Sequence, residues 1–171
     1  LMSMGNMGAL LGAQRKYAEA EAYNRGAMES FRRVLGDEHP LTLQSITNLA
    51  YSLREQGRFA EADSYLREAL EIRQRVLGND HGDTLLSQYY LAALLIKTGE
   101  FGAAAPLVEE CIAGAARLYG ENHPNTLSAM RGAIRMYETW HAADPGAGHD
   151  AKAAQWQAKL DAIRGGTEAD D

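Results

Sequence analysis

The chain has 171 residues, of which 46% are apolar, and this is enough for one domain with a buried core. It carries 17 Lys and Arg against 23 Asp and Glu, and the formal net charge of −6 argues against nucleic acid or an anionic membrane surface as the main partner. No stretch approaches the roughly 18 apolar residues that span a bilayer, and the first residues lack the basic segment of a secretory signal. We therefore expect a cytoplasmic protein whose partner is another protein or a peptide.

A short pattern returns along the chain at a fixed interval. Residues 36–43 read Gly-Asp-Glu-His-Pro-Leu-Thr-Leu, and the Gly, His, Thr and Leu recur at the same places in residues 78–85 and 120–127, each copy 42 residues after the last. Self-similarity at such a period is typical of a solenoid, in which each repeat buries its apolar face only against its neighbours. Apolar positions that keep the same interval are Leu11, Leu53 and Leu95; Tyr17, Phe59 and Phe101; Ala20, Ala62 and Ala104; and Val34, Val76 and Leu118.

Each repeat is predicted to be a pair of helices. Apolar residues spaced by three and four fill residues 42–56, and the same spacing returns in residues 59–76 after Gly57, which can end the first helix in a left-handed conformation. Pro40 and Pro124 stand where a following helix would begin. In chain order, the predicted elements are helix pairs at about 1–35, 40–77 and 83–119, a leading helix at about 124–142, a capping helix at 150–164 and a disordered tail at 165–171.

The residues that could carry chemistry are better explained by packing. The connector histidines recur one repeat apart, and successive helix layers lie about 10 Å apart, too far to share one zinc ion. His141 and His149 fall near two carboxylates, but their spacing matches no known ligand set, so we expect a solvated loop. The single cysteine, Cys111, occupies a repeat position held elsewhere by alanine. We expect no catalytic residue, no metal and no cofactor.

The two ends of the array differ from its middle. The first helix carries several apolar residues, Met4 and Met7 among them, and has no capping residue. We expect either that earlier repeats precede it or that this edge meets another chain, which leaves self-association through the first helix open. At the other end, residues 144–148 break the repeat, and the helix after them has Trp156 and Leu160 on one side, suited to covering the last open face of the stack.

Several short motifs carry a family resemblance. They are Asn-Leu-Ala at 48–50, Gly-Arg-Phe at 57–59, Glu-Ala at 61–62 and Leu-Gly-Asp-Glu-His-Pro at 35–40. With the 42-residue period, they resemble the long tetratricopeptide repeats of kinesin light chains over roughly residues 1–142. The resemblance implies an all-α, right-handed helix-pair solenoid of about 3.5 repeats plus a capping helix, occupying residues 1–164, which acts as a non-enzymatic scaffold that binds a protein or peptide in its concave groove.

A second resemblance concerns the end of the chain. Residues 137–141 and 154–156 look like the C-terminus of bacterial serine/threonine kinases that carry tetratricopeptide repeats. This likeness implies an alternative function, in which the chain is a regulatory or substrate-docking region and a catalytic domain lies upstream.

The expected binding groove is formed by non-core positions of the leading helices. In relatives, asparagines at the positions of Asn6 and Asn48 contact bound peptide, and the resemblance implies the same here, whereas Tyr90 and Gly132 depart from that pattern. Clustered cations in an otherwise acidic chain suggest an acidic peptide. The predicted groove residues are Asn6, Asn48, Tyr51, Arg54, Tyr89, Tyr90, Lys97, Arg131 and Arg135.

Overall fold

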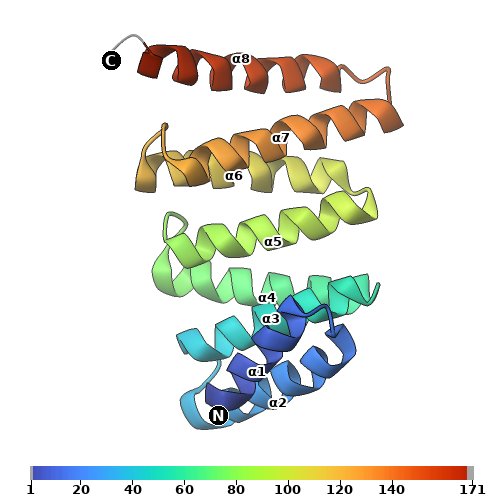
Figure 1. Ribbon diagram of the computed structural model, residues 1–171, viewed down its shortest axis with the longest axis vertical. Coiled ribbons are helices and arrows are strands. Elements are labelled where there is room, and N and C mark those ends of the chain that lie inside the picture. The colour runs from blue at the N-terminus through green and yellow to red at the C-terminus, as the bar shows by residue number, and fades with distance from the viewer. Residues whose placement is uncertain (1, 169–171) are drawn as a thin grey trace. The chain divides into compact units, whose positions relative to one another are not determined.

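Figure 1 shows the computed structural model of the chain, in which residues 2–168 are described. All the regular secondary structure in that range is helical, which confirms the all-α prediction. The helices are α1 (Met2–Ala13), α2 (Tyr17–Leu35), α3 (Pro40–Glu55), α4 (Phe59–Leu77), α5 (Gly82–Thr98), α6 (Phe101–Tyr119), α7 (Pro124–Ala143) and α8 (His149–Glu168).

The second helix of each repeat keeps the period of the sequence without variation. Helices α2, α4 and α6 each have 19 residues, and both ends of each helix lie 42 residues from the ends of the next. The first helix of each repeat varies from 12 residues in α1 to 20 in α7. The helices group into two compact units, residues up to Gly78 (unit 1, α1–α4) and residues from Asn79 onward (unit 2, α5–α8), and each unit is described by itself below.

The connector histidines cap the helices that follow them. His39, His81 and His123 have extended backbones, and the Nδ1 atom of each accepts a hydrogen bond from the backbone N–H two residues later at 3.2 Å. This bond satisfies one of the amide groups that the first turn of a helix leaves without a partner. Pro40 and Pro124 occupy the first turn of α3 and α7, as predicted.

A glycine follows each of α2, α4 and α6, and at Gly78 its place just past the second helix led us to expect a left-handed helical conformation. Gly78 has a positive φ of 85°, but its ψ is 168°, so it lies outside the left-handed helical region. Gly36 and Gly120 do the same. Only glycine adopts this backbone region readily, because a Cβ atom would clash with the backbone, and this explains why the pattern keeps glycine at this place.

Unit 1 has an apolar core that also contains buried polar side chains, Asn24 among them. Ile46, Leu49 and Leu53 of α3 are fully buried. Asn24 of α2 is also buried, and its Nδ2 donates to the backbone carbonyl of Asn48 at 3.3 Å and to Ser52 Oγ at 3.2 Å. Because buried polar groups are costly unless they are hydrogen-bonded, this side chain ties α2 to α3 at one fixed place.

Helix α1 packs against α2 through glycine. A Cβ atom on Gly8 would lie 2.0 Å from Oδ1 of Asn24, and one on Gly26 would lie 2.7 Å from Cε of Met4. Gly8 therefore requires the absence of a side chain for α1 and α2 to approach this closely, whereas at Gly26 the flexible end of Met4 could move aside. Helix α1 also contacts α3, so it packs against two helices of unit 1.

A charged network links α2 to the start of α4 in unit 1. Glu21 accepts hydrogen bonds from Arg25 at 2.9 Å, from Gln56 at 2.9 Å and from Arg58 at 2.8 Å. Partial burial alone would raise the pKa of Glu21, but these three donors outweigh it and hold the pKa below its usual value. The network thus stabilises the ionised carboxylate at the junction of α2, α3 and α4.

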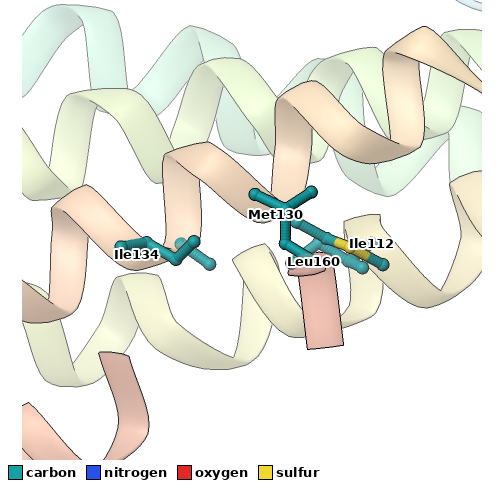
Figure 2. Close-up of a cluster of buried hydrophobic side chains, with 5 residues drawn as sticks. Ile112, Met130, Ile134 and Leu160 are labelled. Carbon is teal, nitrogen blue, oxygen red and sulfur yellow. The ribbon is translucent and has the colours of Figure 1, made fainter. Parts of the chain in front are cut away.

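The core of unit 2 joins three helices. Figure 2 shows Ile112 of α6, Met130 and Ile134 of α7 and Leu160 of α8 meeting in one buried cluster. Helix α8 therefore contributes a core residue and packs along α7 in the opposite direction, as Figure 1 shows. It fills the place of a second helix for α7, after an interruption that the sequence predicted.

The last helix is longer than predicted. Helix α8 begins at His149 and extends to Glu168, whereas we expected a helix at 150–164 and a disordered tail at 165–171. Residues 165–168 continue the helix because two glycines reduce helix stability by only about 1 kcal/mol each and do not block the backbone as proline does. The rest of the predicted tail, residues 169–171, lies outside the described residues.

Candidate functional site

A trough runs between α5 and α7 in unit 2. Figure 1 shows these two helices running in the same direction, and α6, which runs the opposite way, contacts both. Two hollows of about 250 and 450 Å³ lie along them and share Tyr89, Cys111 and Ala129 in their walls. We call the two hollows together the trough. Its walls extend from Gly82 to Ile96 on α5 and from Asn125 to Thr139 on α7.

Small residues make the trough deep. Ala92 and Ala93 of α5 face it from one side, and Ala129 and Gly132 of α7 face it from the other. A Cβ atom on Gly132 would meet no other atom within 4 Å, so this position looks onto open space. Small side chains on both helices therefore leave the space that forms the trough.

Three basic side chains near the trough have no ion-pair or hydrogen-bond partner among the described residues. Arg135 forms part of its wall, Arg131 precedes it by four residues and so lies on the same face of α7, and Lys97 follows Ala93 by four residues on α5. None of the three makes an ion pair or side-chain hydrogen bond with a described residue, and every other Lys or Arg described in unit 2 has an interaction partner. Three unpaired positive charges thus border an apolar surface.

Cys111 lies on the floor of the trough, on α6. Its side chain is 9% exposed and its Sγ lies 3.5 Å from the backbone oxygen of Leu85. Burial, with a smaller contribution from Glu110, raises the pKa of the thiol to about 11. At neutral pH the floor is therefore an uncharged, protonated thiol, as suits the small packing residue that the sequence predicted.

Unit 1 has a smaller hollow between α1 and α3. It measures about 70 Å³, and its walls include Asn6, Asn48 and Gln44. Asn6 is exposed and Asn48 is half-buried, so two of the predicted groove residues come together here. The backbone carbonyl of Asn48 is held by Asn24, which leaves the Asn48 side-chain amide facing the hollow.

The other predicted residues line none of these hollows; they are Tyr51, Arg54, Tyr90, Lys97 and Arg131. Tyr51 packs edge-on against Tyr17 with ring centroids 6.1 Å apart, and the Arg54 guanidinium lies 4.9 Å from the Tyr51 ring centre. Arg54 also pairs with Glu55 at 2.7 Å, so its charge is already compensated. In unit 2, Tyr90 packs edge-on against Tyr89 at 5.7 Å and does not line the trough.

The loop before α8 does not assemble a metal site. His149 stacks on Trp140 with ring centroids 3.7 Å apart, and His141 Nδ1 lies 3.8 Å from Asp150. Among residues 2–168, no group of three or more His, Cys, Asp or Glu side chains could hold a metal ion. Within the same range, no helix is both long and apolar enough to cross a bilayer.

Sequence reasoning missed much of the trough. Its floor and walls include Ala92, Ile96, Val108 and Met136, which the repeat pattern assigns to ordinary packing. The available signal was Gly132, which departs from the asparagine pattern that the resemblance implied. A Cβ atom at this position would meet no other atom within 4 Å, so the missing side chain leaves space at the wall of the trough.

Paired helices that repeat at a constant interval define a helical-repeat protein of the solenoid class. The family model described as the tetratricopeptide repeat matches residues 1–74 and again 43–117, so the chain belongs to the tetratricopeptide repeat family. No curated protein matches the sequence.

Solved structures similar to this chain are of the kinesin-light-chain type. The nearly identical TPR-like repeats of a protein from Podosopora anserina, described as a kinesin light chain, align with a TM-score of 0.71 at 21% identity over 98% of this chain and 96% of that one. BtubC (BKLC) from P. vanneervenii aligns with a TM-score of 0.76 at 18% identity over 96% of this chain and 63% of that one. At these identities the likeness establishes the fold, and it agrees with the resemblance seen in the sequence.

Proposed function

We propose that the chain is a non-enzymatic protein-binding module and that the trough of unit 2 binds an acidic peptide segment of a partner. Tetratricopeptide repeats mediate interactions between proteins in general, and the finer assignment depends on one observation. Arg135 lines the trough, Arg131 and Lys97 each lie one helical turn from a lining residue, and none of the three has an ion-pair partner among the described residues, in a chain whose net charge is −6. Cations of this kind attract an acidic segment and discriminate against a basic one.

The trough supplies the apolar part of the same interaction. Its two hollows have a combined lining that is largely alanine, aliphatic and aromatic, with Tyr89 standing where they meet. Tyrosine gives a large and rigid contact surface at low cost in side-chain entropy, and it is enriched among residues that dominate binding energy. A peptide with apolar side chains next to acidic ones would use both features.

In unit 1 we propose a second contact point at the hollow of Asn6 and Asn48. An asparagine side chain donates and accepts hydrogen bonds at once, so it can hold the backbone of an extended peptide whatever its sequence. Tyr51 would add contact area nearby, whereas Arg54 would contribute less because Glu55 already neutralises it. Replacing Asn48 with alanine tests this contact, and unchanged binding of every peptide would remove it from the proposal.

The proposal is tested by binding to an array of 15-residue peptides that vary in charge and apolar content. Arg131→Glu should weaken the binding of acidic peptides by about tenfold, whereas Arg33→Glu changes net charge equally on an exposed face of unit 1 and should have little effect. Gly132→Trp fills the trough and should abolish binding. Equal effects of the two charge reversals, or normal binding by Gly132→Trp, would remove the trough as the site.

A second candidate interaction uses the outer face of α1. This helix has no charged residue, and Met7 and Leu10 are 40% and 52% exposed, which favours contact with another chain. Met4 is less suitable as a probe because it packs against Gly26. We propose self-association here, and light scattering of Met7→Glu and Leu10→Glu should show a smaller particle than the parent chain; an unchanged mass excludes it.

Residence in the cytoplasm and the alternative role beside a bacterial kinase remain parts of this proposal. A single, unpaired cysteine is usual for a reducing compartment. The kinase alternative is settled by the gene sequence upstream of these residues, and it leaves the trough as the surface that would hold a substrate or a neighbouring domain.

A further inference from the structure

The 250 Å³ hollow of the trough has few groups that could hold an extended peptide backbone, whereas Asp83, Asn125 and Ser128 line the 450 Å³ hollow and could each pair with one. In the 250 Å³ hollow, Thr139 already donates its hydroxyl to the backbone carbonyl of Arg135 at 2.7 Å, and Cys111 contacts the carbonyl of Leu85. The side chains at the two asparagine positions of the family are Tyr90, which does not line the trough, and Gly132. An extended ligand in the 250 Å³ hollow would therefore leave backbone N–H and C=O groups unpaired, at about 1–3 kcal/mol for each one that is buried.

An α-helix does not meet this difficulty because its backbone groups pair with one another. The trough is also long enough for a short helix. Its walls span 15 residues of α5 (82–96) and 15 of α7 (125–139), or about 21 Å at 1.5 Å per residue. The small residues Ala93, Ala129 and Gly132 allow a helix axis to approach within the 8–10 Å at which helices pack.

The unpaired cations can meet acidic residues of a ligand helix. Arg131 and Arg135 are four residues apart on α7, so their side chains are spaced by about one helical turn. Acidic side chains one turn apart on a ligand helix would face them together, and Lys97 would meet the other flank from α5.

We propose that the trough binds its partner as an amphipathic α-helix, with an apolar stripe on the floor at Cys111 and Ala129 and acidic residues one turn apart toward Arg131 and Arg135. This inference rests on the proposed function and adds the conformation of the ligand. It also separates the two units by binding mode, because the hollow of unit 1 keeps both asparagines and suits an extended backbone.

The experiment uses the full chain and the two tightest array peptides whose binding is lost in Gly132→Trp. Each peptide is made in three forms: linear, held helical by an i, i+4 hydrocarbon staple on its polar face, and with proline at its centre. Binding is measured by fluorescence polarisation. A fourth form, with the same staple placed i, i+2 where it does not support a helix, controls for the added hydrocarbon.

The helical staple should tighten binding about tenfold, since it removes part of the ordering cost, and the central proline should weaken binding at least as much. The i, i+2 staple should give no such gain. Proline that is tolerated, or a helical staple that fails to improve binding, overturns the helical inference while the trough remains the binding site. Failure to find any peptide whose binding depends on Gly132 overturns the proposed function itself.

Discussion

Replacing Gly132 with alanine should make unit 2 more stable. Glycine inside a helix is less favourable than alanine by about 0.8–1.0 kcal/mol, and Gly132 lies nine residues into α7. A Cβ atom there meets nothing within 4 Å, so no steric cost offsets the gain. We therefore expect stabilisation of about 1 kcal/mol, or a rise in Tm of about 2–4 °C for a chain of this length.

The assay can be confined to the unit concerned. Both tryptophans of the chain, Trp140 and Trp156, belong to unit 2, so urea unfolding followed by tryptophan fluorescence reports on that unit, while circular dichroism reports on all the helices. Gly132→Ala should raise the midpoint of the fluorescence transition. The substitution should hardly change the slope of unfolding free energy against urea concentration, because the surface exposed on unfolding stays nearly the same.

Gly114 provides a matched control in α6. It makes the same exchange within a helix, but its Cβ would lie 2.4 Å from Cδ2 of the buried Leu85. Overpacking costs about 1–3 kcal/mol, which cancels or exceeds the gain in helix propensity. Gly114→Ala should therefore be neutral or destabilising. A Gly132→Ala chain that is less stable than the parent would mean that this face is packed and that the trough is not open.

Four further predictions concern single groups. Arg15 has a φ of 60°, which strains a non-glycine backbone, and the later repeats have glycine at this position. Arg15→Gly should therefore raise the free energy of unfolding of unit 1 by about 0.5–1 kcal/mol, measured by circular dichroism, and a lower free energy would show that the Arg15 backbone is not strained. His123→Ala removes a helix cap and should cost unit 2 about 1 kcal/mol by tryptophan fluorescence; an equal stability would show that the bond contributes nothing. The lowered pKa of Glu21 contributes stability that is fully present above the ordinary pKa near 4.5 and is lost as the pH falls through the pKa of the folded state. Glu21→Gln should therefore reduce the change in the urea midpoint between about pH 6 and pH 3. The pKa of Cys111, raised to about 11, predicts disulfide-reagent labelling at pH 7 that is about 100-fold slower than in urea and that quickens as the pH rises; equal rates would contradict its burial.

The sequence predicted the helices well because their signals are local and repeated. Apolar spacing, a glycine after each helix and a histidine before the next recur three times, and the bounds of α2, α4 and α6 follow that period residue for residue. The pattern was less informative about burial. Val34, Val76 and Leu118 repeat at the same interval, yet they are 59%, 44% and 45% exposed, because each lies in the last turn of its helix beyond the reach of the core.

The candidate site was predicted only in part, since a groove depends on which side chains are absent between helices. Helical register was sufficient to bring Asn6 and Asn48 to one hollow and to place Tyr89 and Arg135 on the trough. It did not show that Tyr90 would pack against Tyr89 outside the trough, because adjacent residues of a helix point in directions about 100° apart and the sequence alone does not say which of the two faces the neighbouring helix.

The departures from the repeat, more than the repeat itself, distinguish the two units. At the position where unit 1 has Asn48, α5 has Tyr90 and α7 has Gly132. Unit 1 has one hollow of about 70 Å³ between α1 and α3, whereas unit 2 has two hollows, of about 250 and 450 Å³, between α5 and α7. In unit 1 a polar side chain, Asn24, also replaces the aliphatic Leu66 of the next repeat and ties α3 in place through the carbonyl of Asn48. A constant period therefore fixes where the helices lie, while single substitutions at facing positions set what can enter between them. Function in such an array should accordingly be sought first where one repeat differs from the others.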